Sequence, residues 1–97
     1  MALVIDGETY VLRLTLGALA ELEASLGAGS LMALVQRFEG NSFSSADVLA
    51  LLKAGLRGGR AGISEETLFH GEIEGGPLAA ARAAAELLAR AFMVPSV

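Results

Sequence analysis

The chain opens with two short apolar segments that a polar pair of residues separates. Residues 2–5 are all apolar, Asp6 and Gly7 follow, and residues 8–14 form the second segment. An Asp-Gly pair between two such segments is typical of a type I′ hairpin turn, because both residues tolerate a positive φ angle. The sequence therefore predicts a β-hairpin over residues 1–14. The side chains expected on one face of its second strand are Tyr10, Leu12 and Leu14.

Beyond the hairpin, leucine and alanine recur at helical spacing. This pattern predicts three helices within residues 15–57, a flexible connection with one short helix over residues 58–76, and a C-terminal helix over residues 77–93. Three glycines within residues 57–63 are expected to prevent any regular element there. The residues suited to helix N-caps are Thr15, Ser30, Ser64 and Ser44, the last in a capping box with Asp47, and Gly27 is suited to end the first helix.

A hairpin followed only by helices predicts an α+β fold. Ninety-seven residues fit one domain, residues 1–97, with the hairpin packed against a bundle of about four to five helices. A two-stranded ribbon is barely stable in isolation, so the helices are expected to cover it. We expect at least one strand edge to stay free, and such an edge can pair with a partner chain.

Glu23 lies at the edge of the apolar stripe of the first predicted helix. Its carboxylate is placed to reach an arginine such as Arg37 or Arg57, or to bend outward to water, and the sequence leaves both interpretations open. The stripe consists of Leu16, Leu19, Leu22 and Leu26.

The C-terminal helix has an apolar arc wider than a single packing stripe needs. A central helix that touches several neighbours is the favoured explanation, because apolar stripes are usually core. The alternative is that part of the arc binds another chain. The expected seam is Leu78, Ala81, Ala85, Leu88 and Phe92, and the residues that broaden it, the candidates for partner binding, are Ala80, Ala84, Leu87 and Ala91.

Lys53 and Arg57 lie four residues apart and are expected on one face of the third helix. Together with Arg60 they form the main basic cluster of a chain whose net charge is −4. They are candidates for anchoring an acidic partner, although such a cluster is more often a solvated helix face.

The composition excludes several classes of function. Apolar residues make up 54% of the chain, but much of this excess is alanine, and no apolar run approaches the roughly 20 residues of a membrane span. The net charge disfavours nucleic-acid binding, which needs clustered basic residues. We therefore expect a cytoplasmic protein with neither a membrane nor a nucleic acid as partner.

Catalytic chemistry is hard to assemble from these residues. The chain has no cysteine and a single histidine, His70, so Cys-His pairs and multi-His metal sites are impossible. The glycine pairs lack the lysine and the spacing of phosphate-binding loops. We expect no enzyme activity, no catalytic or metal site, no cofactor and no small-molecule substrate.

Three stretches of the chain resemble the small tail-assembly protein of bacterial gene transfer agents and related phages. They are DGE followed by LRLTLGALAELEASLGAGSLMALVQRF (Leu12–Phe38), FSSADVLALLKAGLRGG (Phe43–Gly59) and EIEGGPLAAARAAAELLARAF (Glu72–Phe92). The likeness spans almost the whole chain. It is carried by the order of hairpin, leucine-rich helix, capped helix and alanine-rich helix that starts at glycine and proline.

The resemblance implies a tail assembly chaperone, a cytoplasmic protein without catalytic residues. In that class, copies are thought to coat the long, mostly helical tape-measure protein until the tail tube polymerises around it. The expected partner is therefore the tape-measure protein, and self-association is a further expectation. A wide apolar helix face and a free strand edge are compatible with such contacts.

Two alternatives come from other classes of function. The first is a structural component of the finished tail, such as a tube or connector subunit, which would be present in purified particles. The second, less favoured, is a helix-turn-helix regulator of DNA built from the second and third helices. Its recognition helix would carry almost no polar residues to contact base edges.

Overall fold

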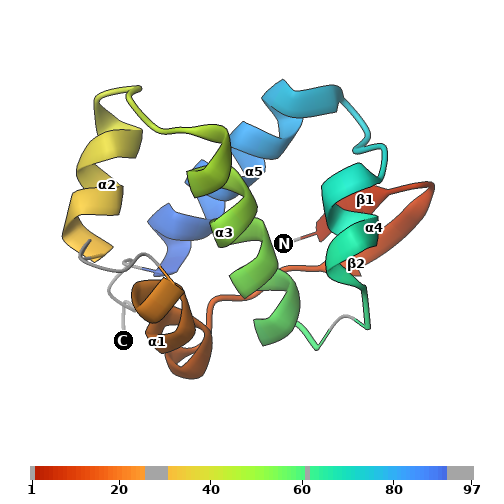
Figure 1. Cartoon of the computed structure of the whole chain (residues 1–97), viewed down its shortest axis with the longest axis horizontal. Helices are drawn as coiled ribbons and strands as arrows, with labels where there is room; N and C mark the ends of the chain where they lie inside the picture. Colours follow the sequence, from red (N-terminus) through yellow and green to blue (C-terminus); the bar gives the residue numbers. More distant parts are fainter. Residues whose placement is uncertain (1, 26–30, 61, 92–97) are drawn as a thin grey trace.

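The structure, a computed structural model, describes residues 2–25, 31–60 and 62–91. Within these ranges two strands are followed by five helices (Figure 1). This arrangement confirms the expected α+β fold, and no described helix is long and apolar enough to cross a membrane. The elements are β1 (Ala2–Ile5), β2 (Glu8–Val11), α1 (Leu16–Ser25), α2 (Leu31–Glu39), α3 (Ser45–Gly58), α4 (Glu65–His70) and α5 (Gly76–Ala91).

The hairpin forms as its Asp-Gly turn predicts. Asp6 and Gly7 both have positive φ angles, 51° and 80°, as a type I′ turn requires. The antiparallel register pairs Ile5 with Glu8. β2 ends at Val11, so the prediction of a hairpin that reaches residue 14 is too long, but the predicted alternation of burial holds over residues 10–14. Leu12 is buried and Tyr10 and Leu14 are half-buried, whereas Val11 and Arg13 are exposed.

The outer edge of β1 is covered by the segment that precedes α5. The Asp6 amide donates to the carbonyl of Glu72 at 2.9 Å, and the Glu74 amide donates to the carbonyl of Val4 at 3.0 Å. Ile73 bridges Ile5 between these bonds. Residues 72–74 therefore extend the two-stranded sheet. On the other edge Gly59 packs against the carbonyl of Val11, so the part of β2 that stays open lies around Thr9.

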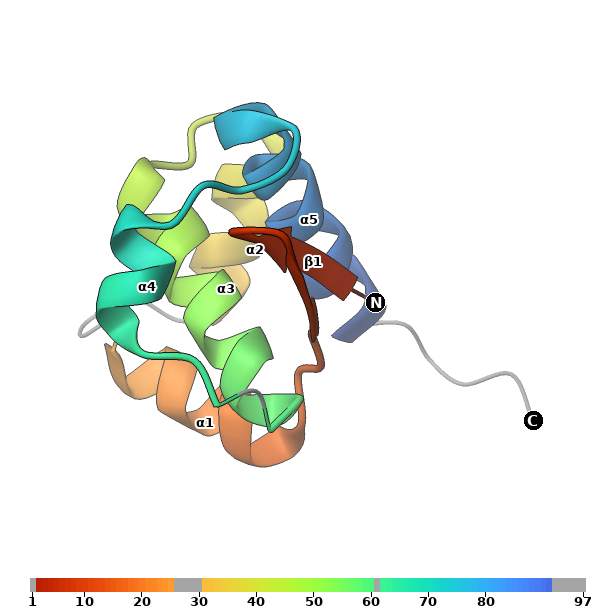
Figure 2. The ribbon, with the colours of Figure 1, turned by 90° about the vertical axis from the view of Figure 1, so that its right-hand side faces the viewer.

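Helix α3 lies at the centre of the molecule. It contacts α1, α4, α5 and β2, and in Figure 2 it is seen between α4 and α5. This central position explains why α3 carries so much of the core. The largest fully buried side chains are Ile5, Leu22, Leu34, Leu51, Leu52 and Leu56.

The glycines at the end of α3 serve close packing. Residues 57–63 were expected to hold no regular element. This prediction is wrong for the first residues of the segment, because α3 continues through Gly58 and Gly59 caps it. A Cβ atom at Gly58 would overlap the carbonyl oxygen of Arg13. The Arg13 amide donates to the carbonyl of Gly55 at 2.9 Å, so the end of α3 packs directly on the backbone that follows β2.

The predicted caps form wherever the structure describes them. The Thr15 hydroxyl accepts from the Ala18 amide at 3.1 Å, and the Ser64 hydroxyl accepts from the Thr67 amide at 3.1 Å. Ser44 begins α3 with the complete capping box. The predictions that concern Leu26, Gly27, Ser30 and Phe92 lie outside the described residues.

The inner face of α1 differs from the predicted leucine stripe. Leu16 is 84% exposed, whereas Ala18 and Leu22 are buried and Leu19 is half-buried. The Ala18 side chain faces Gly58 at the end of α3. Because α1 meets α3 through this small residue, Leu16 in the first turn of α1 points away from the core.

Candidate interaction surface

Most of the predicted partner-binding face of α5 is core. Leu87 is 3% exposed, Ala84 is fully buried and Ala80 is 5% exposed. Ala91 is half-buried at the end of the helix. The core face of the helix is rotated relative to the predicted seam: Leu78 is 64% exposed and Ala85 is exposed, whereas Leu88 from the same seam is 3% exposed. This burial supports the explanation of α5 as a helix that packs in the core.

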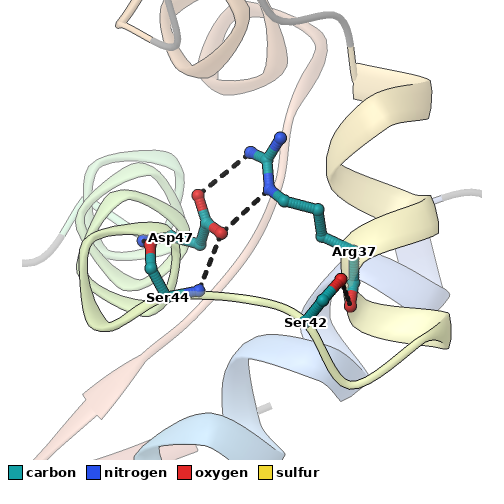
Figure 3. A network of polar contacts seen from close by, with 4 residues as sticks. All are labelled: Arg37, Ser42, Ser44 and Asp47. Carbon is teal, nitrogen blue, oxygen red and sulfur yellow. Dashed lines mark hydrogen bonds and ion pairs between the residues drawn. The ribbon is translucent and has the colours of Figure 1, made fainter.

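Glu23 is exposed, and both arginines considered for it are paired with other carboxylates. The Arg57 Nε atom lies 3.0 Å from an oxygen of Glu21. Arg37 donates two hydrogen bonds, from Nε and Nη2, to the carboxylate of Asp47, each at 3.0 Å (Figure 3). Of the two interpretations left open for Glu23, the structure therefore favours the one in which its side chain points outward to water, because both arginines pair with other acids.

The pair of Arg37 and Asp47 connects α2 to the start of α3. One Asp47 oxygen also accepts from the Ser44 amide at 2.9 Å. Burial alone would raise the pKa of the Asp47 carboxyl, but the hydrogen bonds from Arg37 and from the Ser44 backbone outweigh it and lower the pKa. Beside the pair, the rings of Phe38 and Phe43 stack with centroids 4.5 Å apart. These contacts hold α2 against α3 and have a structural role.

Lys53 and Arg57 do lie together, and they line a hollow between α1, α3 and α4. The hollow has a volume of about 650 Å³, and Leu22, Leu49 and Leu68 are among its apolar lining residues. Among the described side chains that line it, Glu21 is the acidic one. We call this site the basic hollow.

A larger hollow opens between the hairpin, α3, α4 and the start of α5. Its volume is about 1540 Å³, and the charged residues that line it are Asp6, Glu72 and Glu74, with no basic residue in the described part of the chain. We call this site the acidic hollow. Glu72 and Glu74 are exposed.

Phe69 on α4 lines both hollows and is 66% exposed. Its ring meets that of His70 edge to face, with centroids 4.9 Å apart. The sequence-based prediction did not single out Phe69. In the six-residue helix α4 the structure buries Leu68 and leaves its neighbour Phe69 exposed.

Both hollows carry apolar side chains beside charged residues. Exposed apolar side chains beside charged rims are typical of surfaces that bind other proteins. Among the described residues, no three His, Asp or Glu side chains gather in a way that would hold a metal ion.

The chain matches one protein family over most of its length. The model of the family described as phage tail tube protein, GTA-gp10, matches residues 1–94. No curated protein and no solved structure shows a significant match. The match covers the hairpin and all five described helices. It agrees with the resemblance to gene transfer agent and phage tail proteins, while its description names a tube component in place of a chaperone. The chain therefore belongs to the phage tail tube protein GTA-gp10 family.

Proposed function

We propose that this protein is a non-enzymatic structural component of the tail tube of a phage-like particle. The observation that carries the proposal is the family match over residues 1–94, whose description names a tail tube protein. The protein would act by binding other tail proteins, including further copies of itself.

Two separate surfaces support this role. A tube grows through contacts between like subunits, and repeated assembly needs more than one contact surface on each subunit. One is the part of the outer edge of β2 around Thr9. Val4 bonds to residue 74 on one side and pairs with Thr9 across the hairpin, so the backbone groups of Thr9 face outward. The other is the exposed apolar region around Phe69 on α4.

A second candidate is the tail assembly chaperone, which binds the tape-measure protein before the tube closes around it. The basic hollow favours it, because an apolar groove between helices accepts the apolar face of an amphipathic helix. Lys53 and Arg57 at its rim would then contact acidic residues of the bound helix.

The two candidates differ in where the protein is found. Particles are purified, and the chain is quantified by mass spectrometry against the tape-measure protein, with tailless particles as the control. A tube component should be present in many copies per tail and absent from the control. A chaperone should be absent from finished particles and should co-purify with the tape-measure protein from lysates. Absence from both would refute both functions.

A further inference from the structure

The acidic hollow presents a broad apolar surface. Figure 1 shows the hairpin, α4 and the start of α5, which border it, on one side of the molecule. Its volume of about 1540 Å³ exceeds the roughly 300–1,000 Å³ of pockets for small molecules. Phe69 on α4 and Leu78 on α5, which are 66% and 64% exposed, both line it. The half-buried apolar side chains of its lining are Val4, Phe43, Val48, Leu49, Ile73 and Ala81. The hollow is therefore suited to a segment of another macromolecule.

The charged side chains around this surface are acidic. All seven lysines and arginines of the chain lie within the described residues, and none of them lines the hollow. Asp6, Glu72 and Glu74 do line it, and none of the three forms an ion pair with a described lysine or arginine. These three carboxylates give the hollow a formal charge of −3.

The backbone holds the carboxylates in place. The Glu72 amide donates to the Asp6 carboxylate at 2.8 Å. The Glu74 amide donates to the Val4 carbonyl at 3.0 Å, and Ile73 bridges the sheet between them. Because alternate residues of an extended segment point to the same side, Glu72 and Glu74 share one side of it. The acidic rim is therefore formed before any partner binds, which lowers the cost of binding.

The charge and the apolar surface together select the kind of partner. The phosphates of nucleic acids and of anionic lipids would be repelled by three carboxylates. Lysine or arginine side chains would be attracted, and apolar groups beside them would cover Phe69 and Leu78. An amphipathic helix carries both kinds of side chain, and grooves with apolar walls commonly accept such helices.

We propose that the acidic hollow binds an amphipathic helix of another protein whose polar face carries lysine or arginine. The apolar face of this helix packs on Phe69 and Leu78, and its basic residues pair with Glu72 and Glu74. This inference goes beyond the proposed function, because a tube component need not bind a basic helix. A failed binding test would leave the particle measurement unaffected.

The first measurement is fluorescence anisotropy of a labelled model peptide titrated with the purified protein. The probe is a helical peptide of about 18 residues, or five turns, with leucine on one face and lysine on the other. The control peptide keeps the leucine face and replaces each lysine by glutamate. The lysine peptide should bind at least ~10-fold more tightly, and its affinity should fall as salt is added, because ions screen exposed charges.

A pair of double variants tests the acidic rim. Glu72→Gln with Glu74→Gln keeps the backbone hydrogen bonds and should raise the dissociation constant of the lysine peptide at least ~5-fold at low salt. Glu23→Gln with Glu39→Gln changes the net charge equally at exposed positions outside the hollow. This control should change the dissociation constant by no more than ~2-fold.

A pair of leucine variants tests the apolar surface. Leu78→Ser should raise the dissociation constant at least ~10-fold, because the bound helix would bury this side chain. Leu16→Ser is the matched control, since Leu16 is 84% exposed and does not line the hollow. Circular dichroism checks that all variants fold.

Each other outcome overturns the proposal. Equal affinity for the lysine and glutamate peptides would remove the role of the acidic rim. An equal loss of affinity in both glutamine double variants would show that net charge alone attracts the peptide. A Leu78→Ser variant that binds like the original chain would place the contact elsewhere. Absence of binding up to about 1 mM protein would exclude a basic helix as the partner of this hollow.

Discussion

The pair of Arg37 and Asp47 gives a prediction whose magnitude follows from the structure. Two charge-assisted hydrogen bonds join the side chains, which are 35% and 10% exposed. Such bonds are worth about 1.5–3 kcal/mol each when well shielded. Because the guanidinium is partly solvated, we discount this value and expect a coupling free energy of about 1–2 kcal/mol for the pair.

Asp47→Ala also removes the acceptor for the Ser44 amide. Loss of that part of the capping box should lower the free energy of unfolding by about 1 kcal/mol more. The free energy of unfolding should therefore fall by about 2–3 kcal/mol. For a chain of this size the melting temperature should fall by about 10–20 °C.

The assay is urea unfolding of the original chain, Asp47→Ala, Arg37→Ala and the double variant, followed by circular dichroism. The double-mutant cycle separates the coupling of the pair from the effect of the cap. Glu86 and Arg90 form the control pair, since their contact at 2.9 Å joins side chains more than half exposed. Their coupling should be no more than about 0.5 kcal/mol. A coupling between Arg37 and Asp47 as small as the control would refute the reasoning.

Three further predictions concern stability. Leu87→Ala should lower the free energy of unfolding, measured in urea melts, by about 2–5 kcal/mol because it leaves a cavity in the core. Leu78→Ala on the same helix is the control, and because Leu78 is exposed it should change this free energy by at most about 0.5 kcal/mol. Gly58→Ala should lower the free energy of unfolding by about 1–3 kcal/mol, because its Cβ would overlap the Arg13 carbonyl. Gly62→Ala is the control: no atom lies near its added Cβ, so thermal unfolding should show almost no change in stability. The lowered pKa of Asp47 means that its stabilising contribution is complete above about pH 3.8 and is lost as the pH falls through the lower native pKa. The stability difference between the original chain and Asp47→Asn should therefore narrow below that pH in acid titrations, and a constant difference would contradict this assignment.

The local elements were predictable because each depends on residues close together in the chain. The Asp6-Gly7 turn, the Ser44 and Asp47 capping box and the Ser64 cap all form as expected. Turn and cap geometry is decided by the backbone preferences and hydrogen-bonding groups of a few consecutive residues. The sequence alone also indicated the order of the elements and the α+β class.

The candidate surface was predictable only in part. Lys53 and Arg57 were expected on one helix face, and the structure places them at one hollow. The partner of Arg37 was missed because it depends on how α2 meets the start of α3. Phe69 was missed because a helix of six residues is too short for periodicity to separate its inner face from its outer face.

The chain sequence thus determined where strands and helices form, how they begin, and that the apolar inventory suffices for one core. The tertiary structure decided which face of each helix that core takes. An apolar arc as wide as that of α5 fits several rotations about the helix axis, and only packing against α3 selects the one that buries Ala84 and Leu87 and exposes Leu78. The burial of each side chain depends on all the elements that pack around it. The surface that stays exposed for partners therefore follows from the packing of the whole chain.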